Sequence, residues 1–424
     1  MIETLSPPRL RNAPLREPRS ARWIDRTARA GITARLARID QGRIDLVEDG
    51  RTQTFGHASD RCSLASTLRI HDPRVWSRLA FGGTIAAGET YVEGMWEADD
   101  LPAFLRITLR NAHAFDGIDN AWSSVTGWWH RFKHWLRPNS LEGSRTNIAA
   151  HYDLGNDFFT LFLDETLAYS SAIFADDATP LLDASLAKFD HVCRKLELSP
   201  KDHLLEIGTG WGGLAMHAAQ KFGCKVTTTT ISKEQHAFAT RRVQEAGLAD
   251  RVTVLLSDYR HLSGSYDKLV SIEMIEAVGE AYLDEFFVRC SQRLKPNGVM
   301  LLQSITIADE HFDRYRASSD FIQRYIFPGG FLPSVAAMTA RCGKGNDLRM
   351  THLEDFGLHY AKTLRLWRRR FLDRIDEAKG LGYSGDFLRL WDYYFAYCEA
   401  GFEECRTGLV QAMFAKAGWR PGAI

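Results

Sequence analysis

The second half of the chain alternates between short apolar runs and longer stretches that pattern as helices. The apolar runs occupy residues 203–208, 225–231, 252–256, 266–272 and 298–307. Helices are predicted to begin near Gly212, Ser232 and Glu280. Strands separated by helices of this length are typical of a parallel sheet that carries helices on both faces. We therefore expect an α/β fold with a doubly wound, mostly parallel sheet.

The first third of the chain has a different pattern. Residues 38–110 hold short alternating runs that indicate a small mixed α+β domain. Residues 138–146 are rich in turn-forming residues, as in an interdomain linker. We predict an N-terminal domain over residues 38–137, followed after the linker by a second domain over residues 147–424.

Two further segments have the composition of membrane-surface sequences. Residues 1–37 hold eight arginines, no lysine and three acids, which predicts a partly disordered arm with a local charge of +5. Residues 121–137 interleave four tryptophans with basic residues and contain no acid. Segments of both kinds are attracted to anionic lipid surfaces. A solvated tail and an ordinary amphipathic helix are the alternatives.

The composition excludes several classes of protein. Lys plus Arg and Asp plus Glu both total 53, so the chain has no net charge and lacks the signature of a dedicated nucleic-acid binder. Seven scattered cysteines without a Cys-x-x-Cys pair indicate neither a disulfide framework nor a thiolate metal site. The N-terminus lacks a signal-peptide pattern, and no apolar run approaches the ~18 residues of a membrane span. We expect a cytoplasmic protein that is neither secreted nor transmembrane.

A glycine-rich turn follows the first apolar run of the second domain. Residues 206–213 read EIGTGWGG, at the end of a strand and the start of a helix, where a nucleotide can approach the backbone. A dinucleotide site would need an acid ~20 residues further on, and threonines occupy residues 227–230 instead. No phosphate-binding lysine follows the turn. The motif favours a nucleoside without phosphates, with a purely structural turn as the alternative.

A series of stretches resembles the cyclopropane fatty acid synthase family. The stretch SIEMIEAVGEAYLDEFF at residues 271–287 is one of them. The others lie at residues 147–174, 227–235, 257–260, 321–334 and 354–371, and residues 88–97 are similar to a phrase in the N-terminal domain of phospholipid-acting members. The resemblance implies an enzyme that uses S-adenosylmethionine (SAM) to modify an unsaturated acyl chain. It also implies insertions around a lipid tunnel, with the aromatic segment 321–333 as an apolar lid or as ordinary core.

The resemblance assigns SAM binding to a tyrosine–serine pair, the glycine turn, a glutamine and an Asp-Tyr-Arg stretch. The corresponding positions are Tyr169, Ser170, Gly208, Gly210, Gln235, Asp258, Tyr259 and Arg260. A sulfonium ligand prefers aromatic faces and backbone or carboxamide acceptors to a cluster of positive charge. The residue types at these positions agree with that preference.

The resemblance also implies a catalytic base. In the family, a bicarbonate ion held by Cys, Glu, His, an Ile backbone group and Tyr removes a proton after methyl transfer. The corresponding positions are Ser171, Glu276, Gln303, Ile305 and Tyr360. Ser171 replaces the cysteine and Gln303 the histidine, so bicarbonate is a candidate ligand whose position could differ here. Loss of a proton from the new methyl group closes a cyclopropane, whereas loss from the adjacent chain carbon gives a methyl-branched alkene, and both products remain open.

The implied partners are unsaturated acyl chains of membrane phospholipid and the membrane surface itself, with no nucleic acid. A homodimer is one candidate assembly of the protein. Two other functions remain open. One is a C-methyltransferase for a soluble small molecule, and the other is a SAM-binding protein without catalytic activity.

Overall fold

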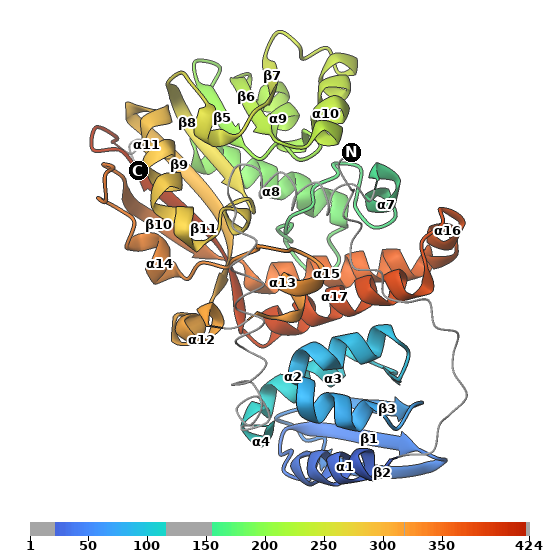
Figure 1. Ribbon diagram of the computed structural model, residues 1–424. Helices are drawn as coiled ribbons and strands as arrows, with labels where there is room; N and C mark the ends of the chain where they lie inside the picture. Colours follow the sequence, from blue (N-terminus) through green and yellow to red (C-terminus); the bar gives the residue numbers. More distant parts are fainter. Residues whose placement is uncertain (1–21, 116–154, 318, 421–424) are drawn as a thin grey trace, which may run out of the picture. The chain divides into compact units, whose positions relative to one another are not determined.

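The computed structural model describes residues 22–115, 155–317 and 319–420. The chain divides into two compact units. The first comprises Met1–Trp135, Ser318–Ile326 and Trp367–Glu404, and the second comprises Leu136–Ala317, Phe327–Leu366 and Cys405–Ile424. The first unit is therefore built from three separate stretches of sequence (Figure 1).

A four-stranded sheet and several helices form the first unit. Its strands are β1 (Gly42–Glu48), β2 (Arg51–His57), β3 (Ala65–Ile70) and β4 (Trp96–Ala98), in the order β2-β1-β3-β4. The N-terminal helices are α1 (Trp23–Leu36), α2 (Val75–Val92), α3 (Leu101–Arg110) and α4 (Ala112–Phe115). Later stretches add α13 (Phe321–Tyr325), the end of α15 (Gly357–Asp373), α16 (Ile375–Gly380) and α17 (Gly385–Glu403).

Apolar packing and ion pairs attach the later stretches to the first unit. Phe321 and Tyr393 belong to the same buried cluster as the strand residue Ile44. Both rings pack directly against Gly88 of α2. A Cβ atom at Gly88 would lie 2.3 Å from the ring of Phe321 and 2.9 Å from the ring of Tyr393. Arg106 and Arg110 of α3 both pair with Glu404, at 2.7 Å.

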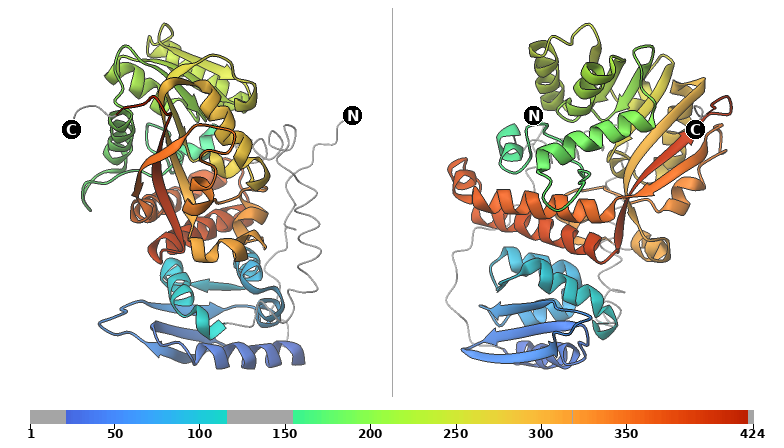
Figure 2. Two further views of the ribbon diagram at one scale, coloured as in Figure 1. Left: turned by 90° about the vertical axis from the view of Figure 1, so that its left-hand side faces the viewer. Right: turned by 180° about the vertical axis from the view of Figure 1, so that it is seen from behind.

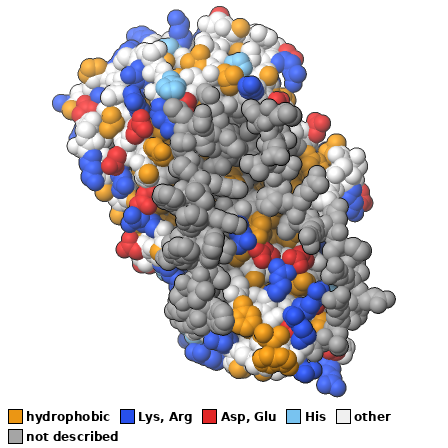
Figure 3. Space-filling view, in the orientation of Figure 1, with side chains coloured by type: hydrophobic (Ala, Val, Ile, Leu, Met, Phe, Trp, Pro, Cys, Tyr) orange, Lys and Arg blue, Asp and Glu red, His pale blue; other side chains and the backbone are white. Residues whose placement is uncertain are grey.

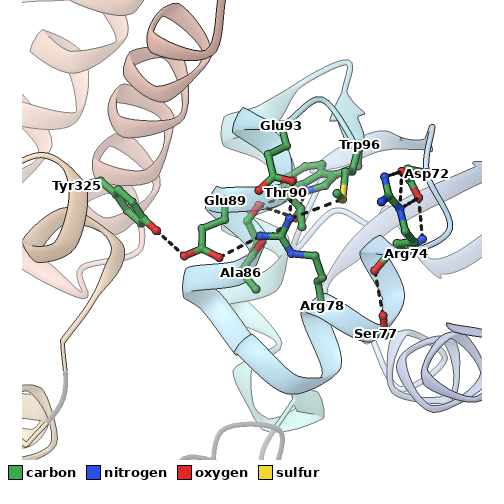
Figure 4. A network of polar contacts seen from close by, with 12 residues as sticks. Asp72, Arg74, Ser77, Arg78, Ala86, Glu89, Thr90, Glu93, Trp96 and Tyr325 are labelled. Carbon is green, nitrogen blue, oxygen red and sulfur yellow. Dashed lines mark hydrogen bonds and ion pairs between the residues drawn. The ribbon is translucent and has the colours of Figure 1, made fainter. Parts of the chain in front are cut away.

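A polar network on α2 adds directional bonds to this packing (Figure 4). The guanidinium of Arg78 pairs with Glu93 and lies 3.1 Å from one carboxylate oxygen of Glu89. The hydroxyl of Tyr325 donates to the other oxygen of Glu89. The short segment around Tyr325 is therefore fixed to α2 by a side-chain hydrogen bond as well as by its apolar neighbours.

The second unit is built on a seven-stranded sheet. Its strands are β5 (His203–Ile207), β6 (Lys225–Thr230), β7 (Val252–Leu256), β8 (Tyr266–Ile272), β9 (Leu294–Ile307), β10 (Arg349–Asp355) and β11 (Thr407–Ala415). Their order is β10-β11-β9-β8-β5-β6-β7, in which β11 is antiparallel to both β9 and β10 and the other neighbours are parallel. The predicted α/β class with a mostly parallel, doubly wound sheet is confirmed.

Helices cover both faces of this sheet (Figure 2). They pack against apolar side chains that alternate between the two faces along each strand. Leu204 and Leu301 belong to one core, with α8 (Leu181–Lys195), α9 (Gly213–His217) and α10 (Lys233–Glu245). Leu205 and Leu302 belong to the other core, with α11 (Leu283–Arg293) and α14 (Val335–Thr339). Two short helices, α7 (Asn156–Thr160) and α12 (Phe312–Arg316), lie in the connections.

The strand order creates a switch point beside β5. The chain passes from β5 to β6 and β7 on one side, and then returns to β8 on the other side of β5. In open α/β sheets, ligands bind at the carboxyl ends of the strands that flank such a point. The glycine turn follows β5, and the residues around Glu276 follow β8.

The observed units differ from the predicted domain boundaries. Helix α1 lies inside the arm predicted for residues 1–37, and two stretches of the predicted second domain, residues 318–326 and 367–404, belong to the first unit. Periodicity indicates an amphipathic helix but not which core receives it, because that depends on contacts distant in sequence. Residues 1–21, the tryptophan-rich segment at 121–137 and the linker at 138–146 lie outside the described residues.

The aromatic segment at residues 321–333 also divides between the units. Phe321 packs as core of the first unit, the alternative to a lid. In the second unit, the amide of Phe331 donates to the carbonyl of Glu276 at 2.8 Å. Among the residues that the structure describes, no helix has both the length and the apolar character to cross a bilayer.

The packing around Gly88 yields a stability prediction. Alanine ordinarily favours a helix over glycine by ~0.5–1 kcal/mol. We expect Gly88→Ala to lower the unfolding free energy by ~1–3 kcal/mol instead, because the new methyl group overpacks the core against Phe321 and Tyr393. Denaturant titration measures the difference. Gly31→Ala in α1 is the matched control, since a Cβ at Gly31 meets nothing within 4 Å, and it should be neutral or stabilising. Equal effects of the two substitutions would contradict this account of the packing.

Candidate active site

The glycine turn opens directly from the end of β5. Gly208 and Gly210 have φ angles of 104° and 51°, a region that side chains other than glycine rarely adopt. A Cβ at Gly208 would lie 3.3 Å from the Cβ of Met274, and one at Gly210 would meet no heavy atom within 4 Å. The turn therefore exposes backbone beside open space, which fits the close approach of a nucleoside.

A buried carboxyl group at the end of β5 stabilises this turn through hydrogen bonds. Glu206, the last but one residue of β5, accepts a hydrogen bond from the hydroxyl of Thr228 at 2.5 Å, and Thr228 also contacts the hydroxyl of Thr209 at 2.8 Å. Burial raises the pKa of Glu206 to about 8, against the opposing effects of Thr228 and Lys188. The threonine run on β6 therefore supports the start of the turn. It occupies the positions where a dinucleotide site would have an acid that binds the ribose.

Tyr169 and Ser170 lie in the loop that precedes α8. The ring of Tyr169 packs edge-on against Phe159, with 5.3 Å between centroids. The hydroxyl of Ser170 accepts a hydrogen bond from Nζ of Lys188 at 2.6 Å. Lys188 is buried on α8, and burial lowers its pKa to about 8 although the nearby acids Glu273, Asp164 and Glu206 raise it. The loop is therefore anchored by a buried lysine.

The remaining predicted SAM residues follow β6 and β7, at the same edge of the sheet as the glycine turn. Gln235 accepts from the hydroxyl of Thr230 at 2.9 Å. Asp258 and Arg260 form a bidentate pair with distances of 2.9 and 2.8 Å, so the positive charge of Arg260 is neutralised locally. The ring of Tyr259 packs against Phe286 of α11, with 5.5 Å between centroids. The absence of an unpaired cation among these four residues suits a sulfonium ligand.

A second cluster forms around the carboxylate of Glu273, just after β8. One oxygen accepts from the amide of Ser171 at 3.0 Å and from Nε2 of Gln303 at 2.8 Å. The other oxygen accepts from the hydroxyl of Tyr360 at 2.8 Å. Three of the predicted catalytic positions therefore converge on Glu273, a residue that was not among the predicted ones.

Glu276 lies three residues further on, in a short 3₁₀ turn. Its Oε1 accepts from the amide of Ile305 at 2.6 Å and from the hydroxyl of Ser304 at 3.2 Å. Its Oε2 is buried and has no hydrogen-bond partner among the described residues. Burial, and then the charge of Glu273, raise the pKa of Glu276 to about 8. The fourth and fifth predicted catalytic positions, Glu276 and Ile305, are thus bonded to each other.

Neighbouring strands fix the orientation of Gln303. This residue is buried in β9, opposite Gln411 of β11. Nε2 of Gln411 donates to Oε1 of Gln303 at 2.9 Å, which leaves the amide nitrogen of Gln303 directed at Glu273. The hydroxyl of Ser171 donates instead to the carbonyl of Ala172 at 3.0 Å, so Ser171 contributes its backbone to the cluster.

The sequence interpretation missed Glu273, Lys188 and Gln411. Glu273 stands inside the stretch at residues 271–287 that carried the family resemblance, three positions before Glu276, and that proximity was the available signal. Lys188 and Gln411 occupy an amphipathic helix and a strand, where nothing local distinguishes a buried polar residue from a solvated one.

Comparison with known proteins identifies the family. A profile of the mycolic acid cyclopropane synthetase family matches residues 139–412. Tuberculostearic acid methyltransferase UfaA1 of Mycobacterium tuberculosis is 38% identical in an alignment of 412 residues that covers 92% of each chain. Cyclopropane-fatty-acyl-phospholipid synthase of Escherichia coli K12 is 35% identical over 365 residues, covering 84% of this chain and 89% of its own.

A solved structure is also similar to this chain. Mycolic acid cyclopropane synthase CmaA1 complexed with SAH and CTAB superposes with a TM-score of 0.60 at 32% identity, over 64% of this chain and 98% of its own. The family match covers more than half of the chain, and both sequence relatives cover more than two thirds of it. This chain therefore belongs to the mycolic acid cyclopropane synthetase family of SAM-dependent methyltransferases.

Proposed function

We propose that this protein transfers the methyl group of SAM to a double bond of an unsaturated fatty acyl chain carried by phospholipid. The observation that carries the proposal is the half-buried pair Glu273 and Glu276 after β8, beside the glycine turn at the end of β5. The names of two relatives support this substrate class. The Mycobacterium tuberculosis enzyme is named for a fatty acid, and the Escherichia coli enzyme is named for a fatty-acyl phospholipid.

The glycine turn and the loop around Tyr169 would hold SAM, together with Gln235 and the Asp258–Arg260 pair. SAM supplies an electrophilic methyl group. An isolated alkene is a poor nucleophile, so the protein has to hold it close to that methyl group in a site without water, and such positioning can contribute ~7–11 kcal/mol. The buried, locally neutralised side chains around the turn are suited to that task.

After methyl addition, a cation remains on the acyl chain and must lose a proton. An acceptor for that proton has to lie in the buried part of the site, because bulk water would attack the cation instead. The carboxyl pair provides such an acceptor. Whether the proton comes from the new methyl group or from the adjacent chain carbon decides between a cyclopropane and a methyl-branched product.

We further propose that the protein works on the membrane surface. On the face drawn in Figure 3, basic and acidic side chains of the described residues are interspersed. Attraction to anionic lipid would then come from the basic arm at residues 1–37, which holds eight arginines, and from residues 121–137, which hold four tryptophans among basic residues.

The reaction itself is tested with purified protein, SAM and vesicles of a phospholipid with one double bond per acyl chain. We expect a product heavier than the substrate chain by one methylene unit, detected by mass spectrometry. With a fully deuterated SAM methyl group, a methyl-branched alkene keeps three deuterons and a cyclopropane keeps two. We expect three, because Ser171 and Gln303 replace the family's cysteine and histidine. Methylation of soluble compounds but not of vesicles, or SAM binding without any turnover, would contradict the proposed function.

Glu276 gives a second prediction. Glu276→Gln can still accept the hydrogen bond from the amide of Ile305, but it lacks the ionisable group. We expect turnover to fall at least ~100-fold, the lower range for loss of an acid–base group, with unchanged SAM affinity by calorimetry. Glu285→Gln on the surface of α11, where Glu285 pairs with Arg289, is the control and should keep full activity. Loss of SAM binding in Glu276→Gln would instead place this residue in the SAM site.

Membrane attachment gives a third prediction. Deletion of residues 1–22, or charge reversal by Arg131→Glu with Lys133→Glu, should reduce co-sedimentation with anionic vesicles at low salt, where surface electrostatics are strongest. SAM affinity should not change, because the predicted SAM residues lie elsewhere in the sequence. Vesicle binding that is unaffected by both changes would remove these segments from membrane attachment.

A further inference from the structure

The donors that converge on Glu273 are those that the family resemblance assigns to bicarbonate. The amide of Ser171, the carboxamide of Gln303 and the hydroxyl of Tyr360 lie 2.8 to 3.0 Å from its carboxylate. The remaining expected donor, the amide of Ile305, is engaged by Glu276. A bicarbonate ion in the same place would find its donors occupied, so the residues present do not fit that ion.

The backbone at Glu273 supports the same interpretation. Its φ angle is 48°, in the left-handed region that favours glycine. The amide of Glu273 donates to the carbonyl of Gln303 at 2.8 Å, which holds the chain in this conformation at the end of β8. Backbone strain of this kind persists mainly at functional sites. A charged side chain at a position suited to glycine therefore indicates a role for the carboxylate itself.

The charges around Glu273 also disfavour an additional anion. Glu276 follows in the same turn, and the buried Lys188 of α8 is the cation whose charge acts on Glu273. The charge of this one buried lysine is already shared among Glu273, Asp164 and Glu206, and the hydroxyl of Tyr360 from α15 bonds to the carboxylate of Glu273. A bound bicarbonate would add a like charge to this cluster without adding a cation, which is costly in a buried site.

The two carboxyl groups have different tendencies to hold a proton. Burial and the charge of Glu273 raise the pKa of Glu276 to about 8, which keeps it mainly protonated at neutral pH. Burial also raises the pKa of Glu273, but Gln303, Lys188, Ser171 and Tyr360 all act in the opposite direction. Paired acids in unlike environments divide into a proton holder and a proton acceptor. The hydrogen bonds to Glu273 favour it as the ionised member.

We propose that the side-chain carboxylate of Glu273 is the general base of the reaction and occupies the place of bicarbonate, so that turnover needs no added ion. The inference rests on the proposed function, because it names the acceptor of the proton that methyl transfer to an alkene releases. Ser171, Gln303 and Tyr360 are positioning residues in this scheme, since they hold the base rather than a diffusible ligand.

The reaction begins at the double bond of the alkene. Its electron pair forms a carbon–carbon bond to the methyl carbon while the carbon–sulfur bond breaks, and the neighbouring chain carbon becomes cationic. A C–H bond of the new methyl group then breaks and its electron pair closes the ring, or a C–H bond of the chain carbon next to the cation breaks and its electron pair forms the new double bond. Glu273 takes the proton as a carboxylic acid and later releases it to water.

The test compares wild-type protein with Glu273→Gly and Glu273→Gln in buffer purged of carbon dioxide, with and without added bicarbonate. We expect wild-type turnover on vesicles to be the same in both buffers. Glu273→Gln should lose at least ~100-fold in both, since a general base is absent. In Glu273→Gly the relief of the strained φ angle offsets part of the cost of losing three hydrogen bonds. This variant should be slow in purged buffer and recover at least ~10-fold with bicarbonate.

A binding measurement separates this role from a structural one. Calorimetry with bicarbonate in the presence of S-adenosylhomocysteine should detect no binding to wild type and should detect binding to Glu273→Gly, where the donors are released. Glu285→Gln is the matched surface control and should behave as wild type in every assay.

Two results would overturn the inference while leaving the proposed function intact. One is wild-type turnover that requires bicarbonate, and the other is a Glu273→Gly variant as active as wild type in purged buffer. A wild-type protein that forms no lipid product in either buffer would overturn the proposed function, and the inference with it.

Discussion

The partial burial of two carboxyl groups at the end of one strand is the constraint on which the site depends. Glu273 and Glu276 are both partly shielded from water, so each needs hydrogen-bond donors that compensate for lost hydration. Three segments distant in sequence supply them: the loop at Ser171, strand β9 and helix α15. The loop before α8 and the start of α15 are thereby tied to the sheet. Their positions relative to the glycine turn follow from the same bonds.

The strand order places this cluster where a ligand can reach it. Strands β5 and β8 are parallel neighbours that the chain visits in separate passes, so their carboxyl ends form one edge. The glycine turn extends from one strand and the carboxyl pair from the other. Lys188 connects the two, because it donates to Ser170 and its charge acts on both Glu273 and Glu206. A methyl donor and a proton acceptor can therefore act on the same stretch of acyl chain.

Local sequence signals were sufficient for five of the seven strands of the second unit and for its glycine turn, but not for β10 and β11. Apolar runs of strand length and the turn EIGTGWGG depend on neighbours in sequence, and the structure places strands and turn where the pattern predicted them. Glu273 was missed because its role depends on donors from residues 171, 303 and 360, and no local pattern reveals that they converge. The attachment of α17 to the first unit was missed for the same reason, since it depends on side chains such as Phe321 and Tyr393 meeting at Gly88.

The most direct measurement of the central claim is a crystal structure of the protein with S-adenosylhomocysteine, grown in bicarbonate. The account predicts that the carboxylate of Glu273 accepts from the amide of Ser171, the carboxamide of Gln303 and the hydroxyl of Tyr360, with no anion between them. A planar three-oxygen ion bound by those same donors, with Glu273 turned away, would contradict it.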